Sequence, residues 1–135
     1  MQRLLDTCVL SEIQKGKNPH VAQKAQAYLS QYKQFTFSLM TRYEILRGLK
    51  DKKAPTQLVH FERLSRKSQI LPLDEDIIVL AADLWVALKQ AGKLIGDNDL
   101  FIAATALHHG LILVTRNVAH FGRIPGLTLE DWTKP

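Results

Sequence analysis

Short apolar runs alternate with longer amphipathic segments along this chain. Four runs are short and apolar enough to be strands buried in a parallel sheet, at residues 3–5, 35–38, 69–73 and 111–115. The segments between them have apolar residues at helical spacing, which predicts helices over residues 21–32, 41–50, 55–66, 76–90 and 100–108. Strands that alternate with helices in this way predict right-handed crossovers and a three-layer α/β/α sandwich, an α/β fold with a short, mainly parallel sheet.

Length and composition limit the partners and the location of the protein. A chain of 135 residues predicts a single domain over residues 1–135. The net charge of +5 and the sequence pI of about 9.5 favour an anionic partner, either a nucleic acid or an acidic protein. The single cysteine, Cys8, excludes an intramolecular disulfide and suits a reducing cytoplasm. No apolar run reaches membrane-spanning length, so we expect a cytoplasmic protein without a membrane partner.

Acidic and amide residues stand where the predicted strands end or the predicted helices begin. They are Asp6 after the first strand, Glu44 early in the helix after the second, Asp97 and Asp99 at the opening of the last long helix, and Asn117 after the last strand. The carboxyl ends of parallel strands share one edge of the sheet, and open α/β sheets bind ligands at that edge. We therefore expect these side chains to converge there.

Several of these residues also have a purely structural interpretation. Asp6 is a suitable N-cap for a helix that starts near Val9. Thr41 and Glu44 have the spacing of a capping box, which would satisfy free backbone donors without any chemistry. Asn117 is a common type of turn residue.

The two aspartates before the apolar helix cannot have the same role. The helix dipole favours both charges, by about 0.3–1 kcal/mol each. Because Asp97 and Asp99 are two positions apart, they cannot share a helix face, so at most one points into a given site while the other caps the helix or faces solvent. The helix that follows is apolar almost all round and should be buried, which would hold its first turn in a fixed position.

The coincidence of several acidic junctions favours one shared site over several unrelated caps. Clustered carboxylates repel each other and need a cation or protons to coexist. Oxygen donors without His or Cys among them suit a hard cation, Mg²⁺ or Mn²⁺. Such an ion lowers the pKa of a bound water and neutralises charge on a phosphoryl oxygen, so the expected substrate is a phosphate ester.

Four motifs together resemble a known family over nearly the whole chain. They are LDTCVLSE, YEILRG, IGDNDLFIAATAL and LVTRNVAHFGRIPGLTLEDW, in that order. The chain is similar to PIN domains of the VapC toxin type, the ribonuclease half of bacterial toxin–antitoxin modules. The resemblance implies a metal-dependent endoribonuclease that cuts tRNA or another structured RNA and arrests translation.

The resemblance also implies roles for individual residues. Asp6, Glu44 and Asp99 match the acids that bind Mg²⁺ or Mn²⁺, and Asp97 matches an auxiliary ligand or cap. Asn117 stands at a fourth catalytic position that is often an acid, so we expect one well-bound ion. The small hydroxyl residue that usually follows the first acid is present as Thr7, but the Asn or Ser usual after it is replaced by cysteine.

The resemblance further implies three kinds of partner. One is the RNA, whose phosphate backbone would be held by basic residues near the motifs. The candidates are Arg42, Arg47, Lys50, Lys93 and Arg116. The others are a VapB-like antitoxin that blocks the acidic pocket, often with a basic side chain, and a second copy of the chain in a homodimer.

Other classes of protein fit less well. A response-regulator receiver domain needs an acid pair after the first strand, and a haloacid-dehalogenase-type phosphatase needs Asp-x-Asp there; here a lone Asp6 is followed by Thr and Cys. A PIN fold that binds RNA or a protein without cutting stays open as an alternative, and RNA incubated with and without Mg²⁺ or Mn²⁺ distinguishes it from a nuclease.

Overall fold

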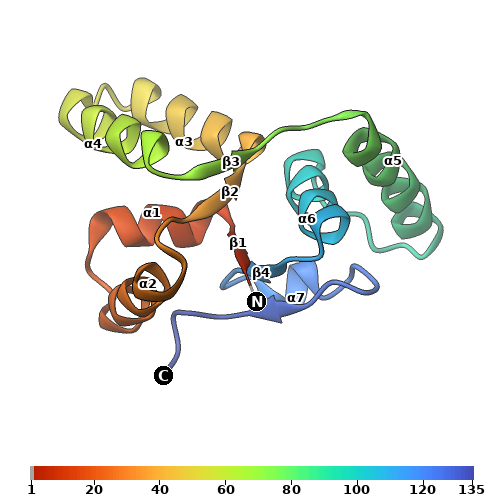
Figure 1. Cartoon of the computed structure of the whole chain (residues 1–135). Coiled ribbons are helices and arrows are strands. Elements are labelled where there is room, and N and C mark those ends of the chain that lie inside the picture. Colours follow the sequence, from red (N-terminus) through yellow and green to blue (C-terminus); the bar gives the residue numbers. More distant parts are fainter. Residues whose placement is uncertain (1) are drawn as a thin grey trace.

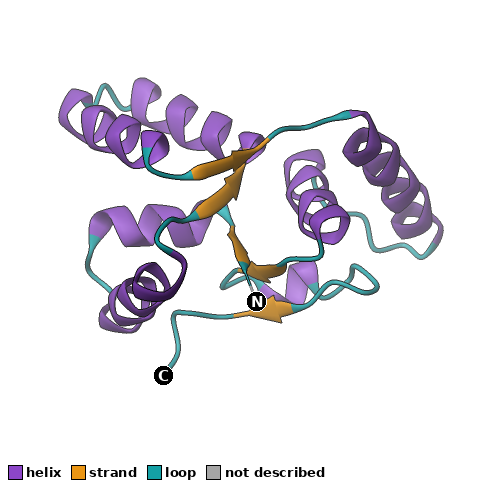
Figure 2. Cartoon of the chain, viewed as in Figure 1, coloured by secondary structure: helices purple, strands orange, loops and turns teal. Residues whose placement is uncertain are grey.

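The computed structural model describes residues 2–135 as helices around one parallel sheet (Figures 1 and 2). The elements are β1 (Arg3–Leu5), α1 (Thr7–Lys15), α2 (Pro19–Tyr32), β2 (Thr36–Ser38), α3 (Leu39–Asp51), α4 (Pro55–Arg66), β3 (Gln69–Leu71), α5 (Glu75–Gln90), α6 (Asp97–His109), β4 (Ile112–Val114), α7 (Val118–Phe121) and β5 (Leu129–Glu130). The strand order is β3-β2-β1-β4-β5, and every neighbouring pair is parallel. Helices α1 to α4 cover one face, and α5 and α6 cover the other (Figure 1). The predicted α/β/α sandwich is confirmed.

Successive strand residues supply the two layers of the core, because side chains along a strand alternate between the faces of a sheet. Leu4 and Leu113 pair across β1 and β4 and pack toward α5 and α6. The next pair, Leu5 and Val114, joins Phe37 of β2 in the cluster under α1 to α4. All five side chains are fully buried. The central strands therefore have no solvent-facing side and appear as continuous apolar runs in the sequence.

The predicted strands and helices are confirmed to within three residues at each end. Two elements were not among the predictions, α7 and β5, and the helix that Asp6 was expected to cap near Val9 is α1, which begins at Thr7. The helix α7 is a single turn and β5 has two residues, one of them charged, so neither is long enough to produce a periodic pattern. No helix between residues 2 and 135 has both the length and the apolar character required to cross a bilayer.

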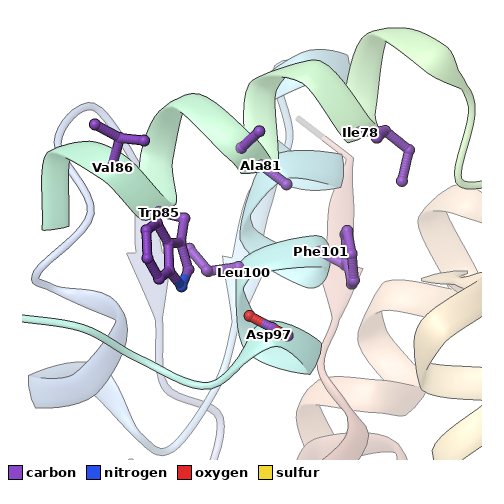
Figure 3. Close-up of a pocket in the computed structure, with 8 residues that line it drawn as sticks. Ile78, Ala81, Trp85, Val86, Asp97, Leu100 and Phe101 are labelled. Carbon is purple, nitrogen blue, oxygen red and sulfur yellow. The ribbon is translucent and has the colours of Figure 1, made fainter. Parts of the chain in front are cut away.

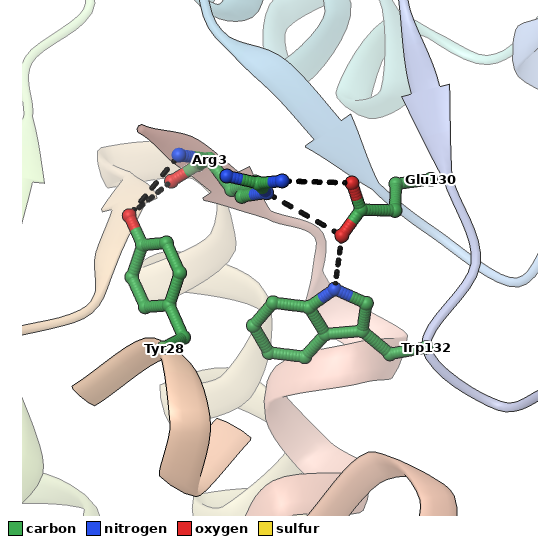
Figure 4. Close-up of polar contacts among 4 residues, drawn as sticks. All are labelled: Arg3, Tyr28, Glu130 and Trp132. Atoms are coloured by element: carbon green, nitrogen blue, oxygen red, sulfur yellow. Dashed lines mark hydrogen bonds and ion pairs between the residues drawn. The ribbon is translucent and has the colours of Figure 1, made fainter. Parts of the chain in front are cut away.

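A polar cluster fixes the last strand and the C-terminal segment to β1 (Figure 4). The Arg3 guanidinium donates to Glu130 of β5, with 3.1 Å between Nη2 and Oε2. The indole Nε1 of Trp132 donates to the other oxygen of the same carboxylate at 2.6 Å. The Arg3 backbone N–H donates to the Tyr28 hydroxyl of α2 at 3.0 Å. This cluster joins β5, the last strand of the sheet, to β1 and α2.

Candidate active site

Asp6 is both a helix cap and a buried acid at the carboxyl end of β1. Its Oδ1 accepts from the backbone N–H of Val9 at 2.9 Å, which confirms the predicted capping role in α1. The carboxylate also accepts a hydrogen bond from Thr115, the residue after β4. Burial raises the pKa of Asp6, these two hydrogen bonds oppose the rise, and the charge of Asp99 adds to it, so the net pKa lies above its ordinary value. Only 4% of Asp6 is exposed, and a cation beside it would favour its charged form.

Thr115 connects Asp6 to the predicted fourth position. Its Oγ1 accepts from the backbone N–H of Asn117 at 3.0 Å while its hydroxyl donates to Asp6. The Asn117 side chain is exposed and does not cap α7. Asn117 thus lies at the exposed rim of the site, and the buried Thr115 hydroxyl connects its backbone N–H to Asp6.

Glu44 lies in the second turn of α3 and reaches across to two other helices. Its Oε1 accepts from the hydroxyl of Thr7 in α1 at 2.6 Å. Its Oε2 accepts from the side-chain amide of Asn98 in α6 at 3.3 Å. These contacts direct the carboxylate toward the junction between β1 and α6, where the other acids lie.

The predicted capping box is wrong. Helix α3 begins two residues earlier than predicted, at Leu39, and its N-cap is Ser38, whose Oγ accepts from the backbone N–H of Thr41 at 3.0 Å. Thr41 is therefore inside the helix, and its hydroxyl lies 3.2 Å from that of Thr7. Because the first turn is already capped by Ser38, Glu44 is free to point into the site.

Asp97 and Asp99 diverge, as their spacing predicts. The N-cap of α6 is Gly96, with extended backbone and no side-chain hydrogen bond, so the expectation that Asp97 caps the helix is wrong. Asp97 is exposed and lines an apolar hollow of about 410 Å³ between α5 and α6, beside Trp85 and Leu100 (Figure 3). Asp99 instead interacts with Asp6 through its charge. Asp99 is therefore the aspartate of this pair that joins the site.

His120 is a site residue that the sequence reasoning missed. Its Nε2 lies 2.8 Å from Oδ2 of Asp99, and its ring packs edge-on against Phe121 at 5.5 Å between centroids. It belongs to the motif LVTRNVAHF, but only oxygen donors were sought there. The signal was a histidine within the same motif as Asn117, one turn further along the chain.

Arg116, one of the five basic candidates, lies close enough to Asp6 for their charges to interact. Its charge lowers the pKa of Asp6 against the larger effect of burial, and it hydrogen-bonds to Cys8. Burial and then the charge of Asp6 raise the pKa of the Cys8 thiol, so its neutral form is favoured at the rim of the site. Lys50 and Lys93 are exposed at the end of α3 and in the loop before α6.

The two arginines of α3 contact other side chains. The Nη1 of Arg42 lies 2.8 Å from Oε1 of Glu62 and 3.0 Å from the Ser65 hydroxyl, so this guanidinium joins α3 to α4. Arg47 lies over the Tyr43 ring, 5.0 Å from its centroid, and is exposed. Arg47 is therefore free to reach a solvent-side ligand, whereas Arg42 would have to leave its ion pair.

The three carboxylates fit a hydrated divalent cation. Within residues 2–135, the ligand atoms of Asp6, Glu44 and Asp99 do not all lie within 4.8 Å of one another. The exposed group Asp74, Asp76 and His108 does meet this distance. Mg²⁺ keeps several waters and is usually held by one or two carboxylates directly, so wider spacing with water bridges suits it. The chemistry of the donor set, all oxygen with one buried acid of raised pKa, fits Mg²⁺ or Mn²⁺.

Comparison with known proteins agrees with this geometry. The model of the PIN domain family matches residues 3–127, from the start of β1 to the residues just before β5. The chain belongs to the PIN-domain family. All the acids of the site lie within the matched range, as do Asn117 and His120.

Relatives place this PIN domain among the VapC ribonucleases. It is 30% identical over 132 residues to Ribonuclease VapC1 of Haemophilus influenzae, covering 97% of this chain and 98% of that protein. It is 28% identical over 128 residues to the tRNA(fMet)-specific endonuclease VapC of Salmonella typhimurium, covering 94% and 93%. Among solved structures, VapBC-1 from nontypeable Haemophilus influenzae has a TM-score of 0.85 and 30% identity, with 99% and 100% coverage. A toxin–antitoxin complex from Klebsiella pneumoniae has a TM-score of 0.69 and 32% identity, with 94% and 96% coverage.

Proposed function

We propose that this PIN domain is the toxin ribonuclease of a toxin–antitoxin module. It would act as one nuclease domain over residues 1–135 and hydrolyse RNA phosphodiester bonds with Mg²⁺ or Mn²⁺ in the cytoplasm. One observation carries the proposal: the buried Asp6 carboxylate lies within the electrostatic reach of Asp99, at the strand edge that Glu44 also approaches. It costs free energy to keep carboxylates charged in such a position without a cation, and a phosphate substrate brings a cation with it.

We assign the metal to Asp6, Glu44 and Asp99, with Asp97 as an auxiliary side chain. Bound there, Mg²⁺ or Mn²⁺ would lower the pKa of a water that it binds and neutralise charge on the phosphoryl oxygen. Each of the three carboxylates is held by a polar group of another element, which keeps the donor set in place before the substrate arrives. Asn117, on the open rim, offers its amide to orient a water or a substrate oxygen.

The chain's own cations would bind the RNA. We assign Arg116 to the phosphate next to the scissile bond, and its interactions with Asp6 and Cys8 support this assignment. Lys93, Arg47 and Lys50 are exposed and extend this basic surface away from the acids. We propose a transfer RNA or another structured RNA as the substrate class, which the tRNA(fMet)-specific endonuclease of Salmonella typhimurium supports.

Two protein partners follow from the same proposal. The solved VapBC and toxin–antitoxin complexes support a VapB-like antitoxin that covers the acidic site. A homodimer is supported by the exposed apolar surface of α5, part of which lines the hollow in Figure 3. Its exposed apolar side chains are Ile78, Val79, Trp85 and Val86.

Cleavage by purified, antitoxin-free protein tests the nuclease. We expect RNA to be cut with Mg²⁺ or Mn²⁺ and to stay intact with a chelator. Asp6→Asn and Asp99→Asn should each abolish cleavage, with a smaller loss for Asp97→Asn, whereas Asp83→Asn on the exposed side of α5 should cut normally. Intact RNA in every tube, from folded protein that still binds RNA, would replace the nuclease with a non-cleaving RNA-binding module.

A further inference from the structure

The contact between His120 and Asp99 has the spacing of two ligands on one metal ion. Their Nε2 and Oδ2 atoms are 2.8 Å apart, and the side chains are 24% and 35% exposed. Neighbouring ligands in an octahedral complex with bonds of about 2.1 Å are separated by about 3 Å. The pair therefore already has close to the separation of two adjacent corners of a coordination octahedron, and both side chains are partly exposed to solvent.

The position of His120 is fixed by the fold. It lies in the single turn of α7, between Asn117 and Phe121, and Phe121 is buried in the core under α6. The edge-on packing of the His120 ring against Phe121 limits how it can rotate. A ring restricted in this way keeps Nε2 on the side of Asp99.

We propose that His120 is a nitrogen ligand of the metal that Asp99 binds, and that it gives this site a preference for Mn²⁺ over Mg²⁺. The inference rests on the proposed metal-dependent function. Imidazole nitrogen suits transition metals and is a poor ligand for Mg²⁺, whereas carboxylates accept both Mg²⁺ and Mn²⁺. Of these two ions, Mn²⁺ is therefore the one that suits all the donors at once. The ligand atoms of Asp6, Asp99 and His120 do not all lie within 4.8 Å of one another, so Asp6 would bind the metal through a water.

A competing interpretation makes His120 a support for Asp99 only, through a hydrogen bond that never involves the metal. Both interpretations predict that removing His120 lowers activity, so activity cannot separate them. They differ in metal selectivity and in direct contact, because a residue outside the coordination sphere weakens Mg²⁺ and Mn²⁺ together.

Titration calorimetry with Mn²⁺ and with Mg²⁺ measures the selectivity directly, without RNA. We expect His120→Asn to weaken Mn²⁺ binding by about tenfold or more while Mg²⁺ binding changes much less, so that the Mn²⁺/Mg²⁺ affinity ratio falls. His120→Gln, which offers an oxygen near the same place, should bind Mg²⁺ about as well as the wild type does, with the Mn²⁺/Mg²⁺ affinity ratio still lowered. The matched control is His108→Asn, because His108 belongs to the exposed group with Asp74 and Asp76, which can bind Mn²⁺ independently.

Electron paramagnetic resonance of bound Mn²⁺ in protein labelled with ¹⁵N-histidine gives a second readout. The spectra are compared in protein that also carries His108→Asn, so that the exposed group with Asp74 and Asp76 contributes no histidine. A nitrogen hyperfine coupling is expected in that protein, and its loss when His120→Asn is added identifies the ligand. An unchanged affinity ratio together with no coupling lost in His120→Asn overturns the proposal and leaves His120 as a support for Asp99. If Asp99→Asn also leaves Mn²⁺ binding unchanged, the proposed metal site itself fails, which is a separate outcome.

Discussion

The hydrogen bond between Thr7 and Glu44 allows a sharp test of how the site is organised. Thr7→Val removes the hydroxyl that donates to Oε1 of Glu44 at 2.6 Å and keeps the branched shape of the side chain. The carboxylate then retains only its longer bond from Asn98, at 3.3 Å. The change leaves all three acids in place and removes one support of Glu44, together with the contact between the Thr7 and Thr41 hydroxyls.

The expected size of the effect follows from the charge and exposure of Glu44. A hydrogen bond to a charged group contributes about 1.5–3 kcal/mol. Glu44 is only half-buried, so water can replace part of the lost bond, and we expect the lower end of this range. About 1.4 kcal/mol corresponds to a tenfold lower kcat/KM for RNA cleavage. The free energy of unfolding should fall by no more than about 1 kcal/mol, because solvent reaches the freed oxygen.

Single-turnover cleavage of RNA, with urea unfolding of the same samples, measures both quantities. Thr7→Ser keeps the hydroxyl and should cut at close to the wild-type rate. Thr105→Val is the matched control: the Thr105 hydroxyl donates to the Phe101 carbonyl within α6 at 2.7 Å, so its loss affects stability and not the site. If Thr7→Val retains cleavage within about twofold of wild type while Asp99→Asn does not cut, the hydrogen bond does not position Glu44 for catalysis.

Two further predictions concern stability and assembly. Burial raises the pKa of Glu130, but the hydrogen bonds from Arg3 and Trp132 outweigh this effect and hold the pKa below its ordinary value of 4.5. The charged Glu130 carboxylate therefore contributes its full stabilisation above pH 4.5, and this contribution is lost as the pH falls through the lowered pKa. Glu130→Gln should therefore lower the free energy of unfolding by about 0.5–1 kcal/mol at pH 7, a value reduced for the partial exposure of the pair. The loss should become progressively smaller as the pH is lowered below 4.5, as a series of urea titrations at decreasing pH can check. Val86 on α5 is 49% exposed, and Val86→Glu should shift the mass measured by light scattering toward the 15.3 kDa monomer. Val59 on α4 is 50% exposed, and the control Val59→Glu should leave the mass unchanged. Equal masses for the two variants would place the dimer interface elsewhere.

The elements that the sequence predicted well are those whose structure depends on local pattern. The strands β1 to β4 are short and buried on both sides, so each appears as an apolar run bounded by polar residues. The position of Asp6 after such a run indicated both its cap and its place at the strand edge. The placement of Asp99 followed from helix periodicity, which sends two residues with this spacing to different faces.

The features that the sequence could not predict depend on contacts between distant elements. The capping-box interpretation of Thr41 failed because Ser38 is spaced to cap the same turn, and only the structure decides between two such candidates. The contact of His120 with Asp99 joins residues 21 positions apart, through the packing of α7 against α6. Neither helix propensity nor periodicity carries information about that packing.

The supports of the acids come from both layers of the core, and this couples the site to the whole fold. Asp6 is held from β4, Glu44 from α1 and α6, and Asp99 from α7. The sheet order makes this possible, because β1 lies between β2 and β4 and so brings their following segments to either side of Asp6. Since α1 packs on one face and α6 on the other, a shift of either layer moves the donors of one acid relative to the others. Substitutions at the supporting residues should therefore combine non-additively, because each acid contributes to catalysis only while the other two keep their positions.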